Sequence, residues 1–471
     1  MIKRLEQIMR CFQGVVPASV ATCSKDGEPN LSYVSHVHYV DSRHVALSCQ
    51  FFNKTRRNVL ENPNAVVSLH DPVTFEAYRL RLRFRHAETE GPLFDQMSLR
   101  IEAIASHTGM KGVFKLIAAD VFEVLSVEEE EGYLLPPTGD TLDEPPPMTQ
   151  RIVGEIAGLQ VLSAQINRAQ DLEGLLDAVL TATRMLFDVE HLMLLLTDET
   201  GARLFTVASR GYGESGVGAE VIIGEGLVGT VARERRPLRV AGVPYELRYG
   251  RAIRERFRVV TRSEPGREIP LPGLPDVQSQ LALPLVVQDR LVGVLALESR
   301  DPLHFDVWHE CFLDILGNQI ALGIATLSAR EDPREETTQS LAPSPPLASS
   351  QPLAPSPVQP QGVLRTFTLY KNDDCVFVDG EYLIRNVPGK ILWKILTEHQ
   401  ASQRREFSNR ELRLDPGLGL PAVKDNLESR LILLRRRLEQ KCPDVRLVST
   451  RRGRFALELG CRLELVERQS A

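Results

Sequence analysis

Three patterns of hydrophobic and polar positions follow one another along the chain. In residues 1–135, short alternating segments are separated by turns. Strands are expected at 18–23, 31–40, 44–48, 65–69, 75–88 and 121–127, with helices at 2–11 and 57–61. Alternating segments of this length form antiparallel hairpins, and a meander of them with few helices closes into a small barrel. The first pattern therefore predicts a small closed β-barrel.

In residues 151–328, apolar residues first recur at helical spacing, and a second helix is expected after Asp171. Strands are expected at 191–197, 204–209, 279–287 and 291–298, and further helices at 224–232 and 305–327. Helices on both sides of an antiparallel sheet form an α+β domain. Residues 136–150 are rich in Pro, Asp and Thr, and they are expected to be a linker.

In residues 362–471, one helix dominates the pattern. Its apolar stripe has spacings of three and four residues, which places the stripe on one side of the helix. The stripe consists of Val423, Leu427, Leu431, Leu434 and Leu438. A hairpin with its turn at 451–454 follows, and strands are expected near 367–369 and 375–378. Residues 329–361 repeat a Leu-Ala-Pro-Ser-Pro unit, so they are expected to be a disordered linker.

Composition agrees with a multidomain protein. The chain has 471 residues, of which 43% are hydrophobic and 25% charged, which suggests about three domains. Its net charge is -6, yet residues 363–471 hold 21 Lys and Arg against 15 Asp and Glu, so the remainder carries -12. The basic end suits a polyanion such as DNA. The seven cysteines lack CxxC spacing, which predicts neither a disulfide framework nor a zinc site. With no apolar leader and no membrane-spanning run, we expect a cytoplasmic protein that does not enter a membrane.

The segment 51–63 carries candidate phosphate chemistry. Lys54, Thr55 and Arg56 lie where a strand ends and a helix begins, and their side chains with the free backbone N–H groups suit a phosphate monoester. This segment and residues 18–41 resemble the pyridoxamine-phosphate-oxidase-like FMN-binding split barrel. The resemblance implies a homodimer that binds FMN. It implies phosphate contacts at Asn53, Lys54, Thr55 and Arg56, and contacts along the flavin near Ser35, His36, His38, Ser48 and Cys49.

Other interpretations of these residues stay open. Lys54 and Arg56 could simply be a solvated basic helix start. His36 and His38 are two residues apart and could bind a metal or haem, but a filled barrel face or a flavin contact is favoured, so no metal site is predicted. Oxidases of pyridoxamine phosphate end this domain with an Arg-containing segment, whereas this chain continues into acidic residues and prolines, so vitamin B6 synthesis is not expected.

The segments 224–229 and 282–298 resemble the GAF domain, which implies a small-molecule effector of unknown identity. The glycines of 224–229 are not followed by the Lys-Ser or Lys-Thr of a phosphate-binding loop, so they are expected to shape a turn. The segment 245–275 would cover the pocket. The apolar stripes of the first and last helices could pair with a second copy or cover their own sheet. These stripes are Ile152, Ile156 and Leu159, and Trp308, Phe312 and Ile315.

From residue 362 onward, the order of elements resembles the OmpR/PhoB-type winged-helix DNA-binding domain. The resemblance implies DNA contacts at Lys424, Ser429, Arg430, Arg436 and Arg437 in the helix and at Arg451, Arg452 and Arg454 in the wing. Ile432 and Leu433 stand where that family usually has polar residues, so the same surface could contact thymine methyl groups or a protein partner. A solvated surface helix is the simpler alternative.

Together these patterns predict a one-component transcriptional regulator. A flavin, its redox state or a small molecule would act on the first two domains, and the last would bind DNA. The alternative is an FMN-dependent oxidoreductase with a regulatory GAF domain and a winged helix used for protein docking. The barrel histidines have no evident carboxylate partner, so no catalytic residue is predicted.

Overall fold

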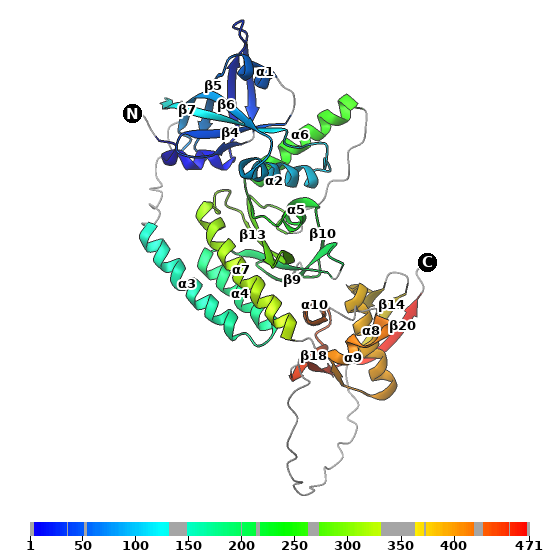
Figure 1. The fold of residues 1–471 in the computed structure, drawn as a ribbon. Coiled ribbons are helices and arrows are strands. Elements are labelled where there is room, and N and C mark those ends of the chain that lie inside the picture. Colours follow the sequence, from blue (N-terminus) through cyan, green and yellow to red (C-terminus); the bar gives the residue numbers. More distant parts are fainter. Residues whose placement is uncertain are drawn as a thin grey trace.

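The structure is a computed structural model. It describes residues 4–34, 36–50, 54–130, 148–198, 200–212, 217–261, 273–330, 363–371, 374–418, 427–451 and 453–468. Three parts follow one another from the N-terminus to the C-terminus (Figure 1), and each contains sheets of its own.

The N-terminal part is built on a seven-stranded sheet in the order β2-β1-β5-β6-β7-β4-β3. Its strands are β1 (Ala18–Cys23), β2 (Pro29–Val34), β3 (Val37–Tyr39), β4 (His44–Cys49), β5 (Asn64–His70), β6 (Ala77–Glu88) and β7 (Ala118–Glu130). All neighbouring pairs are antiparallel, as the alternating pattern predicts. The single strand expected at 31–40 is instead two strands, β2 and β3, at opposite edges of the sheet.

Three helical segments accompany this sheet: the 3-10 helix η1 (Leu5–Gln13), α1 (Lys54–Glu61) and α2 (Pro92–His107). The alternating pattern did not predict α2, which begins with a proline after Gly91, a favoured start for a helix. Its buried residues Met97 and Ile104 share an apolar core with the middle part of the chain, in a cluster that includes Val228 and Val231. The helix therefore joins the two parts.

The middle part is a six-stranded sheet in the order β10-β9-β8-β13-β12-β11 with helices on both faces (Figure 1). Its strands are β8 (His191–Thr197), β9 (Arg203–Arg210), β10 (Glu220–Ile222), β11 (Leu238–Ala241), β12 (Ser279–Val287) and β13 (Arg290–Ser299). Its helices are α3 (Met148–Arg168), α4 (Leu172–Phe187), α5 (Gly226–Glu234), α6 (Val243–Thr261) and α7 (Val307–Arg330). The predicted α+β arrangement is confirmed for this part.

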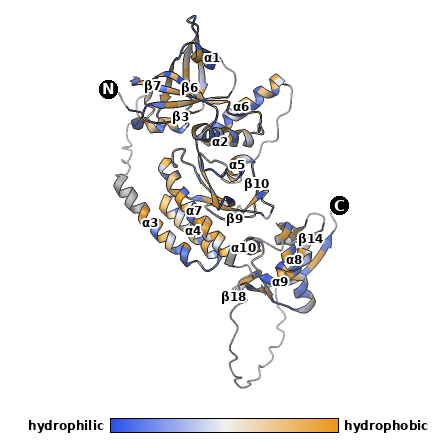
Figure 2. Cartoon of the chain, viewed as in Figure 1, coloured by the Kyte–Doolittle hydropathy of each residue, from blue (hydrophilic) through white to orange (hydrophobic). Residues whose placement is uncertain are grey.

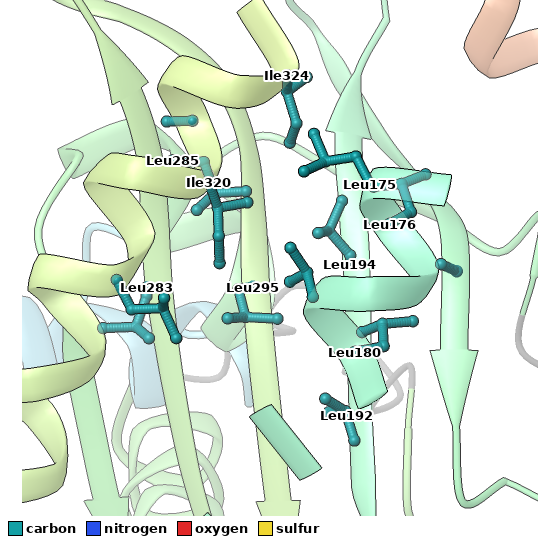
Figure 3. Close-up of a cluster of buried hydrophobic side chains, with 14 of the residues drawn as sticks. Leu175, Leu176, Leu180, Leu192, Leu194, Leu283, Leu285, Leu295, Ile320 and Ile324 are labelled. Atoms are coloured by element: carbon teal, nitrogen blue, oxygen red, sulfur yellow. The ribbon is translucent and has the colours of Figure 1, made fainter. Parts of the chain in front are cut away.

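The core of the middle part lies between its sheet and the helices α4 and α7. Figure 3 shows Ile320 and Ile324 of α7 and Leu176 and Leu180 of α4 directed at leucines of the strands, such as Leu194. In Figure 2 both helices carry hydrophobic residues along much of their length. The segment Val307–Ser328 of α7 is long and apolar enough to cross a membrane. Its buried side chains pack instead on the sheet.

The outer sides of the first and last helices of the middle part remain partly uncovered. Phe312 is buried on the domain's own sheet, whereas Ile156 and Ile315 are exposed. The helices therefore cover their own sheet, and pairing with a second copy through their outer sides stays a prediction.

Tight turns set the geometry of the middle part. Gln288 and Asp289 both have positive φ, of 48° and 60°, which is the backbone of a two-residue hairpin turn between β12 and β13. Gly224 and Gly226 have φ of 85° and 65°, so the predicted turn at 224–229 is confirmed. Gly229 lies so close to β10 that an added Cβ would be 2.3 Å from the carbonyl oxygen of Ile222.

Among its described residues, the C-terminal part has two sheets and three α-helices. The sheets run in the orders β16-β15-β14-β20 and β17-β19-β18. The strands are β14 (Leu364–Tyr370), β15 (Cys375–Val378), β16 (Glu381–Ile384), β17 (Glu406–Ser408), β18 (Val445–Arg451), β19 (Arg454–Leu459) and β20 (Arg462–Arg468). The helices are α8 (Asn386–Ser402), α9 (Asn409–Arg413) and α10 (Leu427–Lys441), with the 3-10 turn η3 (Pro416–Leu418).

The predicted stripe of α10 is the centre of this part. Leu427, Leu431, Leu434 and Leu438 are all fully buried in an apolar core with residues of α8 and the strands. Val423 lies outside the described residues. The predicted hairpin is also present as β18 and β19, with Gly453 in the left-handed region at φ 68°.

Candidate functional site

Two neighbouring cavities lie where the N-terminal and middle parts meet. The interdomain cavity, of about 270 Å³, lies between η1, β3 and α2 on one side and β11, α6 and α7 on the other. The barrel cavity, of about 80 Å³, is lined mainly by β2, β4, α1 and β7. The two cavities share part of their walls, because Ser48, Gln50 and Tyr249 line both. Tyr249 comes from α6 of the middle part and donates a 3.1 Å hydrogen bond to Gln50 Oε1.

The first turn of α1 faces the barrel cavity through two of its three predicted phosphate-binding side chains. Thr55 and Arg56 line the cavity. The Thr55 hydroxyl lies 2.8 Å from the Ser32 hydroxyl and accepts from Asn30 Nδ2 at 3.0 Å. Lys54 lines neither cavity, because its ammonium forms a 2.6 Å ion pair with Glu28. The structure thus brings a hydroxyl, a guanidinium and the start of a helix to one place.

A thiol and a carboxyl group complete the polar wall of the barrel cavity. Arg56 Nη1 donates to Cys49 Sγ at 3.1 Å, and Asp120 of β7 lines the same cavity. Burial raises the pKa of Asp120 to about 6, although the charge of Arg56 acts in the opposite direction. Burial also raises the pKa of the Cys49 thiol, which therefore stays protonated at neutral pH.

The two predicted histidines lie together in the interdomain cavity. Their rings are 5.6 Å apart, edge to face. His36 Nε2 lies 2.8 Å from the Phe12 carbonyl oxygen, and since a carbonyl can only accept, this nitrogen carries the proton. Burial lowers the pKa of His36 well below its usual value and the pKa of His38 to about 4, with Arg100 contributing to both. Both rings are therefore neutral at physiological pH.

Charged side chains on the cavity wall are arranged in pairs. Arg100 of α2 forms a 2.7 Å ion pair with Glu246 of α6, and Arg239 of β11 forms a 2.9 Å ion pair with Glu310 of α7. The Arg100–Glu246 pair crosses between the two parts of the chain. Within the described residues, the buried Nε of Arg100 has no hydrogen-bond partner. The cavity thus offers hydrogen-bonding groups with little net charge.

These walls fit a phosphorylated ligand with a flat polar ring. The Thr55 hydroxyl, the Arg56 guanidinium and the N-terminus of α1 would hold a phosphate. The amide of Gln50, the Ser48 hydroxyl and the neutral histidines would face the edges of the ring, and Tyr249 offers an aromatic face. In the part of the chain that the structure describes, no group of three or more His, Cys, Asp and Glu residues could hold a metal ion.

The structure assembles most of the predicted flavin residues but not all. His36 and His38 line the interdomain cavity, Cys49, Thr55 and Arg56 line the barrel cavity, and Ser48 lines both. Ser35 and Asn53 lie outside the described residues. Sequence reasoning missed Gln50, Asp120, Arg100, Arg239 and Tyr249. Only Gln50, beside Cys49, could have been found from the motif, since the others come from distant elements.

The segment 245–275, expected to cover a pocket, is partly the helix α6. Its residues Glu246 and Tyr249 line the interdomain cavity. The helix therefore covers a cavity, but one shared with the N-terminal part. Residues 262–272 lie outside the described chain.

The predicted DNA-contacting residues divide into two groups. Arg451 and Arg454 are exposed at the tip of the β18–β19 hairpin, and among the described residues neither forms an ion pair. The residues on α10 are engaged within the protein. Ser429 and Arg430 are buried, Arg436 contacts Asp177, and Arg437 donates to the Leu383 carbonyl oxygen at 3.0 Å. Lys424 and Arg452 lie outside the described residues.

Burial affects Arg430 most strongly. It lowers the pKa of its guanidinium to about 10, although the charge of Asp198 opposes the shift. The group remains charged at neutral pH, and its 7% exposure leaves little of it available to a phosphate.

Comparison with known proteins identifies two of the three parts. Residues 5–130 match the pyridoxamine 5'-phosphate oxidase family, and residues 171–324 match the GAF domain family. The chain thus contains a split barrel of the first kind followed by a GAF domain. Neither match reaches residues 363–468. A comparison with curated proteins finds no match.

Solved structures of both kinds are similar to parts of the chain. The GAF domain of a phosphoenolpyruvate-protein phosphotransferase from Acinetobacter is 24% identical, covering 37% of this chain and 95% of its own, with a TM-score of 0.30. An FMN-binding protein from Syntrophomonas wolfei is 16% identical, covering 27% and 90%, with a TM-score of 0.23. HupZ from Group A Streptococcus is 21% identical, covering 27% and 94%, with a TM-score of 0.22.

Proposed function

We propose that the chain is a one-component transcriptional regulator. The split barrel and the GAF domain suggest a sensory or regulatory protein. We assign DNA binding to residues 363–468 as a winged helix, and flavin or small-molecule sensing to the first two domains. The observation that carries the DNA-binding half is the pair of exposed arginines, Arg451 and Arg454, at the tip of a hairpin that follows a helix. Cations on a wing contact the phosphates of a duplex.

The flavin half of the proposal is supported by the shared cavity walls. In the split barrel, Thr55 and Arg56 offer hydrogen-bond donors for a phosphate. Ser48, Gln50 and Tyr249 line both this cavity and the interdomain cavity. FMN would supply redox chemistry when bound, and the residues of the chain would hold and orient it. Because α6 of the GAF domain forms part of the wall, a ligand bound in the site would contact both domains.

Homodimer formation is part of the same proposal. The edge strand β2 exposes Leu31 and Tyr33, with 64% and 72% of their surfaces accessible. An exposed apolar edge strand is suited to an interface between copies. Leu322 and Ile315 of α7 provide a second exposed apolar surface on the GAF domain.

Flavin binding is tested by titrating the purified full chain with FMN and following flavin fluorescence. We expect quenching on binding, and a roughly 100-fold weaker affinity when Thr55→Val is combined with Arg56→Gln, since each lost contact to a charged group is worth about 1.5 kcal/mol or more. The matched control is Arg57→Gln, the exposed next residue of the same helix. A protein that ignores FMN would contradict this half of the proposal.

DNA binding is tested with residues 362–471, whose apolar core is formed almost entirely by their own side chains. We expect binding to a mixed-sequence duplex that weakens steeply between 50 and 200 mM salt. Combining Arg451→Ala with Arg454→Ala should weaken it and reduce the salt slope by about 2. Arg462→Ala with Arg468→Ala, on the other sheet, serves as the control. Absence of binding at low salt would sink the regulator assignment.

The competing function is a flavin-dependent oxidoreductase in which the C-terminal domain serves only for docking. The observation that favours it is the burial of α10 residues within the protein. Fast turnover with reduced nicotinamide, combined with no binding of the 362–471 fragment to DNA, would select this function.

A further inference from the structure

The side of α10 that faces away from the core of the C-terminal part is buried against the GAF domain. This docking face consists of Ile432, Leu433, Arg435 and Arg436. Ile432 is completely buried, yet it belongs to the apolar core of the GAF domain and not to that of its own domain. Leu433 lies in the core of the C-terminal domain together with Val217 of the GAF domain. Figure 1 shows α10 on the side of the C-terminal part that faces α4 and β9.

Two acidic residues of α4 meet the two arginines of the docking face. Arg436 Nη2 lies 2.8 Å from Asp177, and Arg435 Nη1 lies 3.2 Å from Glu173. Glu173 and Asp177 are four residues apart, so they lie on one side of the helix. Both arginine side chains are only 11% exposed. Without these acids, the buried Arg435 would keep only its 3.5 Å ion pair with Glu428 of its own helix, and the buried Arg436 would lose its partner carboxylate, which weakens the contact with the GAF domain.

The sheet of the GAF domain is also shaped for this contact. A bulge between β8 and β9 pairs Leu194 with Ala208 and Leu195 with Thr206, so Val207 has no residue opposite it. Arg436 Nη1 donates a 2.9 Å hydrogen bond to the Val207 carbonyl oxygen. At the adjacent loop, a Cβ added to Gly218 would lie 3.4 Å from the Leu433 side chain, so this side chain packs directly on the loop.

A third ion pair lies outside the docking face. Arg385, just before α8, forms a 2.8 Å ion pair with Glu220 of β10. The contact between the domains therefore combines a buried apolar side chain, three ion pairs and a hydrogen bond to the backbone. This combination is what a specific interface contains.

We propose that the docking face is an interaction surface for the chain's own GAF domain, and that this docking competes with DNA for α10. The second half rests on the proposed function. The same helix carries the arginines expected to approach DNA, and Arg436 cannot contact Asp177 and a phosphate together. Of the described arginines that are expected to contact DNA, docking would leave Arg451 and Arg454 at the hairpin tip available, and undocking would release Arg436 as well.

Docking is measured in the full chain by the rate at which single introduced thiols react with a maleimide, read by mass spectrometry of the labelled peptides. Three positions are compared: Ile432→Cys on the docking face, Val448→Cys at a partly exposed site and Leu434→Cys in the domain core. We expect the thiol of Ile432→Cys to react as slowly as that of Leu434→Cys. Reaction as fast as that of Val448→Cys would overturn the docking.

The interface is then released from the GAF side, which leaves the C-terminal domain unchanged. Glu173→Gln with Asp177→Asn should accelerate labelling of Ile432→Cys at least tenfold, while Leu434→Cys stays slow. The control is Glu234→Gln with Glu255→Gln, which removes two exposed carboxylates from the same domain. Unchanged labelling of Ile432→Cys in the released chain would contradict a role for the ion pairs.

DNA affinity of the same full-length variants separates the two claims. If docking competes with DNA, the released chain binds a mixed-sequence duplex at least tenfold more tightly than the parent and the control. Equal affinity in a chain whose thiol has become reactive overturns the competition but leaves the docking intact. Absence of DNA binding by the released chain and by the 362–471 fragment instead overturns the proposed function.

Discussion

Asp120 is an acid whose ionisation is opposed by the fold. It is 6% exposed, its Oδ1 has no hydrogen-bond partner among the described residues, and its pKa is about 6. Because the folded state holds this proton more tightly than the unfolded chain does, the stability that the proton contributes is complete below about pH 4 and is lost as pH rises through 6.

Replacing Asp120 with Asn should remove this pH dependence. We expect Asp120→Asn to raise the free energy of unfolding at pH 7.5 by up to about 3 kcal/mol, since one pKa unit corresponds to about 1.4 kcal/mol. At pH 4 the variant and the parent should be similar. Urea denaturation at both pH values measures the difference. Asp26→Asn, in an exposed turn, is the control, and an equal change at both pH values would contradict the explanation.

At the scale of single residues, sequence reasoning found those that share one short segment. Thr55 and Arg56 follow directly from the strand-to-helix motif, and both line the barrel cavity. Lys54 belongs to the same motif, but its side chain points away from the cavity because its ammonium pairs with Glu28, which lies in the turn between β1 and β2. Spacing along the chain indicates which side chains are near, whereas the partner of a long flexible side chain depends on the folded surroundings.

At the scale of elements, α5 depends on Gly229, which allows the helix to pack closely against the backbone of β10. An added Cβ at Gly229 would be 2.3 Å from the backbone oxygen of Ile222, which cannot rotate away. Gly229→Ala should therefore lower the free energy of unfolding by about 2 kcal/mol, because the overlap outweighs the better helix propensity of alanine. Thermal unfolding measures the change.

The control for this element is a glycine with room around it. A Cβ at Gly317 in α7 would be 3.6 Å from Leu285, an ordinary contact. We expect Gly317→Ala to leave the free energy of unfolding unchanged or to raise it by up to about 1 kcal/mol. The unfolding temperature should then stay the same or rise. If both variants behaved alike, close approach would not be the reason for Gly229.

Most elements could be predicted because their periodicity is local. The hairpin of β12 and β13 and the stripe of α10 agree with the spacing of apolar residues. The helices α2 and α6 could not be predicted in the same way. Their buried residues face other domains as well as their own, so their apolar positions do not follow the stripe of an ordinary surface helix.

For the molecule as a whole, the cavity wall shared by two domains predicts that a substitution in the GAF domain weakens FMN binding to the barrel. Tyr249 of the GAF domain lines both cavities and bonds Gln50 of the barrel. We expect Tyr249→Ala to weaken FMN binding by about tenfold, since an aromatic contact and a hydrogen bond are lost. Fluorescence titration of the full chain measures this effect.

The matched control is Tyr245→Ala, one turn earlier in α6, where the side chain is 46% exposed. Its FMN affinity should equal that of the parent. If Tyr249→Ala also bound FMN normally, the GAF domain would not form part of the flavin site, even if the barrel alone bound FMN.

The residues that form the contact between the C-terminal part and the GAF domain could not be predicted from the sequence. The apolar side chain of Ile432 is unusual on a surface that is expected to contact DNA, and it therefore indicates a protein partner as an alternative. The sequence held no sign that the partner would be α4 of the same chain, because nothing in the spacing of Glu173 and Asp177 distinguishes them from ordinary surface acids.

The acidic pair on α4 also has a genetic consequence. If docking competes with DNA as we propose, and a reporter gene responds to this chain, spontaneous mutations that make the reporter independent of the effector should collect at codons 173 and 177, outside residues 363–468. Second-site suppressors of those alleles would then be expected at codons 435 and 436, and their charges would identify which pair of contacts had been rebuilt.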